Sequence, residues 1–443
     1  MRVPLLPFLL AIACSATAMA QSSLIQSGPM VGHVDMREAK IWLQTTQPAS
    51  VRIVYRDSAS PSRTYTSQIV RTNASIANTV TISLDSVEPA TTYLYDVYVN
   101  EIKFSFPYAT QFRTQPVWRW RPSGPPNVRI AMGSCTYVNE ERFDRPGTPY
   151  GSEYGIFTSI AAATPDVMLW LGDNTYTREA DWNSRAGFLH RYTHTRSLPE
   201  MQPLLARTAN YAIWDDHDYG PNDGDRGYWG KNMSLEIFNA FWANPSAGVM
   251  DKPGITTSFE IADAQFFLLD DRYYRAPNDR VDGERTILGE HQVQWLIDAL
   301  ATSNATFKFV CVGSQFLTDN LRKECFSRIP EERQRIIDEI TTNKIRGVVF
   351  LTGDIHATEL SKLDRAGTYP LYEFTCSSLT AGSNKGIAEQ TNAYRVAGTE
   401  YGLHNFGIAT LRGPEKDRTL TLTVHDVKGN TVWTRDIKAS ELR

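Results

Sequence analysis

The pattern of hydrophobic and polar positions divides this chain into two regions with different periodicities. Between residues 22 and 115, apolar and polar residues alternate over short runs that turn-forming residues separate. Alternation with a period of two is typical of strands buried on one face, and several such strands at regular spacing predict a β-sandwich. The predicted strands are residues 39–45, 50–57, 78–84, 93–99 and 110–114.

One local motif makes this prediction more specific. Leu84, Pro89 and Tyr93 resemble the corner before the penultimate strand of fibronectin type III-like domains, where a tyrosine hydroxyl bonds back to the main chain. We therefore expect residues 21–116 to form a fibronectin type III-like β-sandwich domain. The stretch 117–126 contains several Pro residues and a Gly, which is typical of a linker.

After the linker, runs with strand periodicity alternate with runs typical of helices. This alternation predicts a layered α/β domain over residues 127–443 with central, mostly parallel β-sheets. The predicted helical stretches include residues 154–164, 235–244, 289–303 and 331–344. The chain then returns to strand-like runs at residues 406–411, 419–427 and 431–437.

Composition limits the classes of function. The 443 residues are 42% hydrophobic and 21% charged, as in ordinary globular proteins. The formal net charge of −4 offers no basic patch for nucleic acid. Any phosphate chemistry therefore needs metal ions and a few local Arg or Lys residues.

The first twenty residues have the pattern of a signal peptide. Arg2 supplies the positive start, residues 5–13 the apolar centre and residues 18–20 a small-residue cleavage site. No later apolar stretch reaches membrane-spanning length, so we expect a secreted or periplasmic protein. The absence of a twin arginine favours the general secretory route. Lipidation of Cys14 stays open.

Four other cysteines are too few for a disulfide scaffold in a chain of this length. Cys311 lies within an apolar run and is interpreted as a core residue. Whether Cys325 and Cys376 pair cannot be read from their positions. Cys135 follows the end of a predicted strand, which gives it a different interpretation.

Six apolar runs of the second region end abruptly in polar residues that can bind metals or phosphate. Carboxyl ends of parallel strands meet at one edge of a sheet, where ligand sites form in open α/β folds. A single Gly-Asp after a strand is ordinary turn chemistry, but six successive cases predict a site. The segments are residues 133–135, 172–176, 215–218, 270–275, 313–315 and 352–356.

The donor atoms in these segments indicate two kinds of metal. The Cys135 thiolate and the Tyr176 phenolate suit Fe(III), whereas aspartates favour harder ions such as Ca²⁺, Mg²⁺ or Mn²⁺. His356 could serve either metal, and Asp173 is best placed to bridge two ions. Two neighbouring ions can hold the attacking and leaving oxygens of an in-line displacement. The aspartates concerned are Asp173, Asp216 and Asp354.

The ordered set GSC, GDxxY, WDDHD, DxRxxR and GDxH resembles the alkaline phosphatase D (PhoD-type) family of calcineurin-like metallophosphoesterases. That resemblance covers nearly the whole chain after residue 20, because the family also has an N-terminal fibronectin-like domain. It implies iron ligands at Cys135, Asp173 and Tyr176, and calcium ligands at Asp173, Asp216 and Asp354. His356 corresponds to the last metal-binding histidine of the superfamily. His217 corresponds to a histidine that contacts phosphate and leaving group, and Arg275 to a phosphate-binding arginine.

The resemblance implies a phosphoesterase that uses a metal-bound hydroxide, with Mn²⁺, Zn²⁺ or Mg²⁺ as substitute metals. Expected substrates are small-molecule phosphate esters, and phospholipids or other phosphodiesters stay open because relatives include phospholipase D-type enzymes. We further expect Asp216 and Asp218 to keep His217 protonated. The alternative is a non-catalytic, calcium-stabilised adhesion or glycan-binding protein, but the acidic loops lack the 12-residue calcium-loop spacing.

Several other polar residues are assigned less specific roles. His190 and His194 lie four residues apart on a predicted helix and are interpreted as surface or site-rim residues. His33 is isolated and is interpreted as structural. Asp218 replaces a glutamate common in the family, which puts the orientation of His217 in question. Asn222 is a candidate further calcium ligand.

Overall fold

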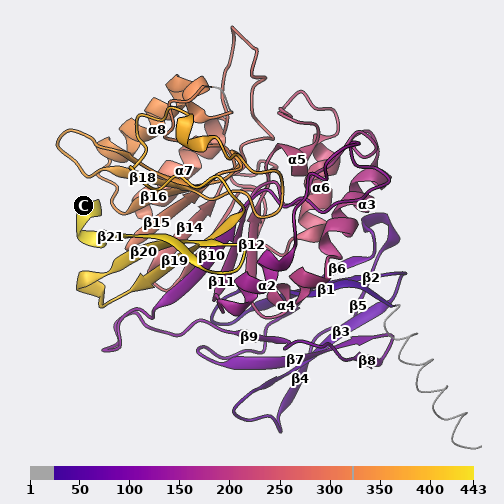
Figure 1. The fold of residues 1–443 in the computed structure, drawn as a ribbon. Coiled ribbons are helices and arrows are strands. Elements are labelled where there is room, and N and C mark those ends of the chain that lie inside the picture. Colours follow the sequence, from indigo (N-terminus) through magenta and orange to yellow (C-terminus); the bar gives the residue numbers. More distant parts are fainter. Residues whose placement is uncertain (1–23, 322–323) are drawn as a thin grey trace, which may run out of the picture.

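The computed structural model describes residues 24–321 and 324–443. The predicted signal peptide and Cys14 lie outside this part. A smaller β-sandwich at the N-terminal end packs against a larger domain in which two β-sheets are stacked (Figure 1). Within the described residues, no helix is both long and apolar enough to cross a membrane.

The sandwich confirms the strands predicted from alternation. In β3 and β7 every second residue is buried, as expected for strands with one face on a core. One sheet has the order β1-β2-β6, with β1 Ile25–Val34, β2 Ala39–Thr45 and β6 Thr79–Leu84. The other has the order β4-β3-β7-β8, with β5 beside β3 and β9 beside β7. Its strands are β3 Ser50–Asp57, β4 Thr64–Thr66, β5 Val70–Arg71, β7 Thr92–Val99, β8 Ile102–Phe104 and β9 Gln111–Arg113.

The predicted tyrosine corner is confirmed, because the Tyr93 hydroxyl accepts the Glu88 backbone N–H at 2.8 Å. Strand β1 was not predicted, since its Gly and Pro residues interrupt the alternation. Its glycine Gly32 is required by tertiary packing: a Cβ there would lie 2.3 Å from the Cβ of Ala243 in the larger domain. Strand β1 therefore contributes to the contact between the two domains, together with residues of β2 such as Trp42, whose indole N–H donates to the Ala240 carbonyl at 2.8 Å.

The predicted layered α/β domain with central β-sheets is confirmed, but the sheets are mixed rather than mostly parallel. Its strands form two mixed six-stranded sheets, with orders β12-β11-β10-β19-β20-β21 and β13-β14-β15-β16-β18-β17. The parallel strands are β10 to β12 in the first sheet and β14, β15, β16 and β18 in the second, with antiparallel strands flanking them. The six strands that precede the polar motifs are thus divided three and three between the sheets.

The first sheet consists of β10 Val128–Gly133, β11 Val167–Leu171, β12 Ala209–Ile213, β19 Asn405–Arg412, β20 Thr419–Asp426 and β21 Thr431–Lys438. The second consists of β13 Thr257–Ile261, β14 Ala264–Leu268, β15 Phe307–Cys311, β16 Val348–Thr352, β17 Glu359–Leu363 and β18 Leu371–Thr375. Strands β11, β12, β15 and β16 are buried along their whole length, because each sheet is covered on both faces.

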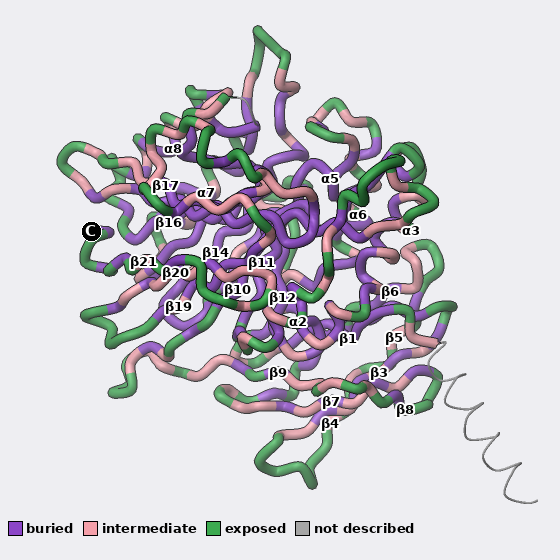
Figure 2. Tube along the Cα trace, viewed as in Figure 1, coloured by how far each residue is buried: buried purple, intermediate pink, exposed green. Residues whose placement is uncertain are grey.

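Helices cover the outer faces of the stacked sheets, with α7 and α8 over the second sheet and α2 and α4 beside the first (Figure 1). The buried residues form the interior of this layered arrangement, and exposed residues are mainly in the loops (Figure 2). The helices are α2 Gly155–Ala162, α3 Arg185–Arg196, α4 Gln202–Leu205, α5 Asp216–Tyr219, α6 Lys231–Phe241, α7 Glu290–Thr302 and α8 Pro330–Thr342. Short 3₁₀ helices are η1 Ala74–Ile76, η2 Pro199–Met201, η3 Phe326–Arg328, η4 Ile387–Glu389, η5 Glu415–Asp417 and η6 Ala439–Leu442.

A buried ion pair ties the two sheets together at the end opposite the motifs. Arg418, directly before β20, donates to both carboxylate oxygens of Asp263 in the β13–β14 turn, at 2.7–3.1 Å. Both side chains are at most 2% exposed. The same guanidinium also donates to the carbonyls of Pro126 and Gly413, so its hydrogen-bonding capacity is used. This pair links the first sheet, the second sheet and the linker.

We expect Arg418→Ala to lower the free energy of unfolding by about 3–5 kcal/mol, because Asp263 would be left as an unpaired buried charge. Chemical denaturation measures this change. The matched control is Arg412→Ala in the same sheet, which removes an ion pair to Asp436 whose side chains are about half exposed. Arg412→Ala should lower the free energy of unfolding by only about 0–1 kcal/mol. Equal effects of the two substitutions would contradict the role assigned to Arg418.

Candidate metal centre

The polar segments of both sheets meet at one edge of the stacked sheets. Close backbone approach there explains the glycines of the motifs. A Cβ on Gly353 would lie 2.7 Å from the Leu171 carbonyl oxygen and 2.5 Å from Ser134 Oγ. Gly172 has φ +92°, and a Cβ on it would lie 2.8 Å from the Cβ of Asp215. Only glycine fits such positions, so the motifs are spaced to bring the strand ends together.

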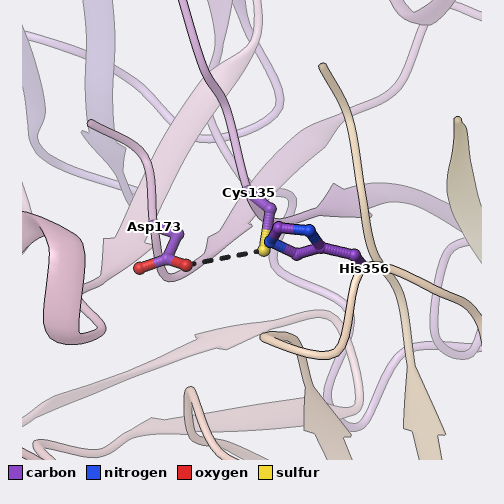
Figure 3. A group of neighbouring side chains, drawn as sticks. All are labelled: Cys135, Asp173 and His356. Atoms are coloured by element: carbon purple, nitrogen blue, oxygen red, sulfur yellow. Dashed lines mark hydrogen bonds between the residues drawn. The ribbon is translucent and has the colours of Figure 1, made fainter. Parts of the chain in front are cut away.

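Cys135, Asp173, Tyr176 and His356 form the first group of donor atoms. The Cys135 sulfur lies 3.6 Å from Asp173 Oδ2, which also accepts the Tyr176 hydroxyl at 3.1 Å. The Tyr176 hydroxyl is 3.0 Å from His356 Nε2. Figure 3 shows Cys135, Asp173 and His356 converging from separate loops. Their donor atoms lie within 4.8 Å of one another, as ligands of one metal ion must.

Asp173 also belongs to a second group of donors. One set of atoms within 4.8 Å combines Asp173, Asp216 and His217, and another combines Asp173, Asp215 and Asp354. Asp173 thus occurs in three candidate sets, which fits the bridging role that its position in the sequence suggested. The second group contains oxygen and imidazole donors but no thiol, so the two halves of the site differ in chemistry.

The backbone at these ligands is in an unfavourable conformation. Cys135, Asp173, Asp354 and His356 all have positive φ, between 51° and 69°. Non-glycine residues rarely adopt this region, and such positions cluster at functional sites where the surrounding structure holds them. Four of the six predicted metal ligands thus have a positive φ. Local sequence preference would not select this backbone conformation, so tertiary contacts impose it.

Burial and mutual repulsion favour the protonated forms of these groups. Burial raises the pKa of Cys135 to about 12. Burial, together with the nearby charge of Asp216, raises the pKa of Asp173 well above its usual value. Burial and the charge of Asp173 likewise raise the pKa of Tyr176. A bound cation would reverse this balance, so the set fits metal ions that displace protons from their ligands.

His217 belongs to the second group, and its ring centroid lies 4.2 Å from that of Tyr176 in the first. Within the described residues its Nδ1 is buried and has no hydrogen-bond partner, which suits a metal or substrate contact. Burial lowers the pKa of His217, and the attraction of Asp216 only partly opposes this. The expectation that flanking carboxylates keep the imidazole protonated is therefore wrong. Asp218 instead accepts the backbone N–H groups of Asn174 and Asp215, each at 3.1 Å.

Arg275 lies behind the cavity wall. Its side chain is 1% exposed and is 3.2 Å from Glu324. It also donates to Asn278 and Ser314, each at 3.4 Å. Glu324 and Asn278 line the cavity, so they stand between Arg275 and a bound substrate. Arg272, from the same motif, is buried between Asp215 and Glu324 and links the two sheets.

A cavity of about 590 Å³ is lined by Asp173, Asp216, His217, Asp354 and His356. Sequence reasoning missed several of its lining residues because they follow no strand end. Tyr150 is 3.4 Å from His356 Nδ1, and Arg328 is the one cation among the described lining residues. Asn222, the candidate further calcium ligand, lines the cavity. The other lining residues that were missed are Asp223, Asp225, Pro277, Asn278, Asp279 and Glu324.

The remaining cysteines and histidines have structural contacts. Cys135, Cys311, Cys325 and Cys376 are all buried and free, so the open question of a Cys325–Cys376 disulfide is answered. His190 contacts Glu140 at 2.8 Å, and His194 contacts the Asn139 carbonyl at 3.0 Å. Neither lines the cavity, which agrees with the surface or rim interpretation. His33 contacts the Tyr211 hydroxyl across the domain interface.

Two stretches of the chain match known domain families. Residues 131–412 match the model of the PhoD-like phosphatase family, and residues 22–117 match a domain of unknown function, DUF7800. The chain is 22% identical over 364 residues to alkaline phosphatase D of Bacillus subtilis (strain 168). That match covers 70% of this chain and 59% of the relative. The chain therefore spans little more than half the length of this curated relative.

Two solved structures share the fold. A structure of PhoD superposes with a TM-score of 0.75 at 18% identity, covering 95% of this chain and 92% of that chain. A purple acid phosphatase from yellow lupin (Lupinus luteus) seeds superposes with a TM-score of 0.65 at 11% identity, covering 93% of this chain and 74% of that chain. The family match extends over most of the chain and includes all six polar segments. The chain belongs to the PhoD-like phosphatase family.

Proposed function

We propose that this protein is a metal-dependent phosphoric ester hydrolase of the alkaline phosphatase D type. The observation that carries the proposal is that the Cys135 thiol and the Tyr176 hydroxyl both contact Asp173, which lines one cavity together with several other carboxylates. Hydrolysis of phosphate esters requires cations that neutralise the phosphoryl oxygens, and this cavity is lined mainly by acids that can hold such cations. Membership of the PhoD-like phosphatase family supports the same reaction.

We assign Fe(III) to Cys135, Asp173 and Tyr176, because anionic sulfur and phenolate donors suit a trivalent ion. We assign Ca²⁺ to Asp173, Asp216 and Asp354, whose oxygen donors suit a hard cation. His356 is near both groups, and Mn²⁺, Zn²⁺ or Mg²⁺ are candidate substitutes. When bound, such ions lower the pKa of water and neutralise charge on phosphoryl oxygens.

The chain's own groups are proposed to bind the phosphate. His217 lines the cavity, and a neutral imidazole can donate its N–H in a hydrogen bond to a phosphoryl or leaving oxygen. Arg275 is proposed to bind phosphate, which requires Glu324 or Asn278 to yield its present contact. Arg328 lines the cavity directly and offers a second positive charge for an anionic substrate.

Small-molecule phosphate esters are the proposed substrates. A cavity of about 590 Å³ also leaves room for a second ester group, so phosphodiesters, including phospholipids, are the second candidate class. We also propose export to a secreted or periplasmic location, based on the signal-like residues 1–20.

The experiment that tests the proposed function combines metal analysis with turnover on one phosphomonoester and one phosphodiester. The wild-type protein should contain iron and calcium, absorb visible light and hydrolyse at least one of the esters. Cys135→Ser should lose iron and most activity, because the hydroxyl is a far weaker anionic donor than the thiolate. Cys311→Ser, at a buried cysteine in β15 away from the cavity, is the control that should retain iron. Full iron content in Cys135→Ser would contradict the ligand assignment.

Metal binding should release protons, and its affinity should rise with pH. The pKa values of Cys135, Asp173 and Tyr176 are all raised, so these ligands hold protons that a metal must displace. At a metal concentration 100 times Kd, binding adds about 2.7 kcal/mol to stability. We expect this gain in the free energy of unfolding to become smaller as pH falls. Thermal unfolding of the metal-depleted protein, with and without added metal, measures it. A pH-independent increment between pH 6 and 9 would rule out protonated ligands.

His217→Ala should lower turnover by about 10²–10³ while metal content is retained, because a preorganised donor to the substrate is lost. Arg275→Ala should lower turnover in the same direction if the arginine reaches phosphate. Bound metal and turnover must be measured separately for each variant. His190→Ala, on the exposed face of α3, is the control and should match the wild type. A variant that loses its metal, or keeps full activity, would disprove the role given to that residue.

A further inference from the structure

The loop that follows β18 packs against the backbone of Cys135. The N–H of Leu379 donates to the Ser134 carbonyl at 2.8 Å, and those of Thr380 and Ala381 donate to the Cys135 carbonyl at 3.2 and 3.0 Å. Ser377 lies at the start of this loop and is completely buried. The loop thus brings Ser377 beside the sulfur, although the two residues are 242 positions apart in the sequence.

We propose that Ser377 is a positioning residue that donates a hydrogen bond to the Cys135 thiolate and tunes the metal bound there. The Ser377 hydroxyl is 3.1 Å from the Cys135 sulfur. This inference rests on the proposed function, because it concerns the iron that Cys135 is proposed to bind. The Ser377 hydroxyl is not itself a proposed ligand and would act on the metal only through the Cys135 sulfur.

The contacts of Ser377 fix the direction of its proton. The hydroxyl oxygen accepts the backbone N–H of His356 at 3.2 Å, which leaves the O–H free to point to the sulfur. Its backbone is held as well: the N–H donates to Thr358 Oγ1 at 3.2 Å, and the carbonyl accepts Asn405 Nδ2 at 2.8 Å. The residue therefore joins two metal motifs, since it contacts both Cys135 and His356.

The other hydroxyls near the sulfur have different acceptors. Ser134 Oγ is 3.5 Å from the sulfur, but it donates to the Cys376 carbonyl at 3.0 Å. A hydroxyl has one proton, so this contact uses it. The Tyr176 hydroxyl is directed at Asp173 and is itself a proposed ligand. Ser377 is thus the hydroxyl, among those of the described residues, whose geometry directs its proton to the thiolate.

A hydrogen bond to a metal-bound thiolate withdraws electron density from sulfur. Such bonds are among the factors that set the reduction potential of thiolate-ligated metals. With the bond in place, the sulfur donates less charge to iron, the metal stays more electrophilic, and charge transfer from sulfur needs more energy. Loss of the bond should therefore stabilise the ferric state and move the absorption band to longer wavelength.

The test compares iron-loaded wild-type protein, Ser377→Ala and Ser134→Ala. We expect Ser377→Ala to keep iron, to shift the visible band to longer wavelength, and to raise the ferric-to-ferrous ratio at a fixed potential about tenfold. For a one-electron couple, a tenfold change corresponds to about 59 mV. Ser134→Ala removes an equally buried neighbouring hydroxyl and should leave both quantities unchanged. A wild-type spectrum in Ser377→Ala, or equal shifts in both variants, would overturn the inference.

A second measurement needs no variant. Resonance Raman spectra of wild-type protein loaded with iron in H₂O and in D₂O should differ in the iron–sulfur stretching frequency, because the donated proton exchanges for deuterium. Identical frequencies would overturn the inference even if Ser377→Ala failed to fold. An iron-loaded wild type without any charge-transfer band would instead disprove the iron assignment itself, and the inference with it. The two failures are therefore distinguishable.

Discussion

Buried negative charge at the edge where the two sheets meet is the constraint on which the rest of this structure depends. Asp173, Asp215 and Asp216 are each at most 4% exposed and lie close together. Isolated carboxylates are too costly to bury, so each needs a proton, a cation or a hydrogen-bonding partner. The structure meets this requirement differently in two zones, one neutralised by arginine and one suited to metal ions.

In the first zone, Arg272 lies between Asp215 and Glu324, with Arg275 beside the same glutamate. These contacts join loops from both sheets and are completed by the protein itself. In the second zone, neither Asp173 nor Asp216 forms an ion pair with an arginine of the described residues, and both line the cavity. The negative charge of these two carboxylates remains available for a cation. Acidic residues after a strand thus have two roles here. In the first zone they form ion pairs that join the sheets, and in the second they can bind metal ions.

Close packing and backbone strain serve this arrangement. Gly172 and Gly353 let the strand ends approach, and four proposed ligands adopt positive φ to direct their side chains into one volume. Such conformations are tolerated where surrounding contacts hold them. The loop after β18 supplies part of that support, since it hydrogen-bonds to the backbone of Cys135 and to the sulfur through Ser377. Ligand geometry therefore depends on residues that are remote in sequence.

The sequence by itself determined the local features of this protein: the alternating strands of the sandwich, the helices, the tyrosine corner and the polar segments that follow apolar strands. Burial periodicity and donor chemistry are properties of neighbouring residues, so they can be read along the chain. Only the tertiary structure decided that six motif strands divide between two sheets, that Arg275 lies behind Glu324, and that burial lowers the pKa of His217. It also supplied Tyr150, Arg328 and Ser377. The burial of a side chain, the pairing of strands and the direction of a hydrogen bond arise from contacts between distant segments, and no local pattern encodes them.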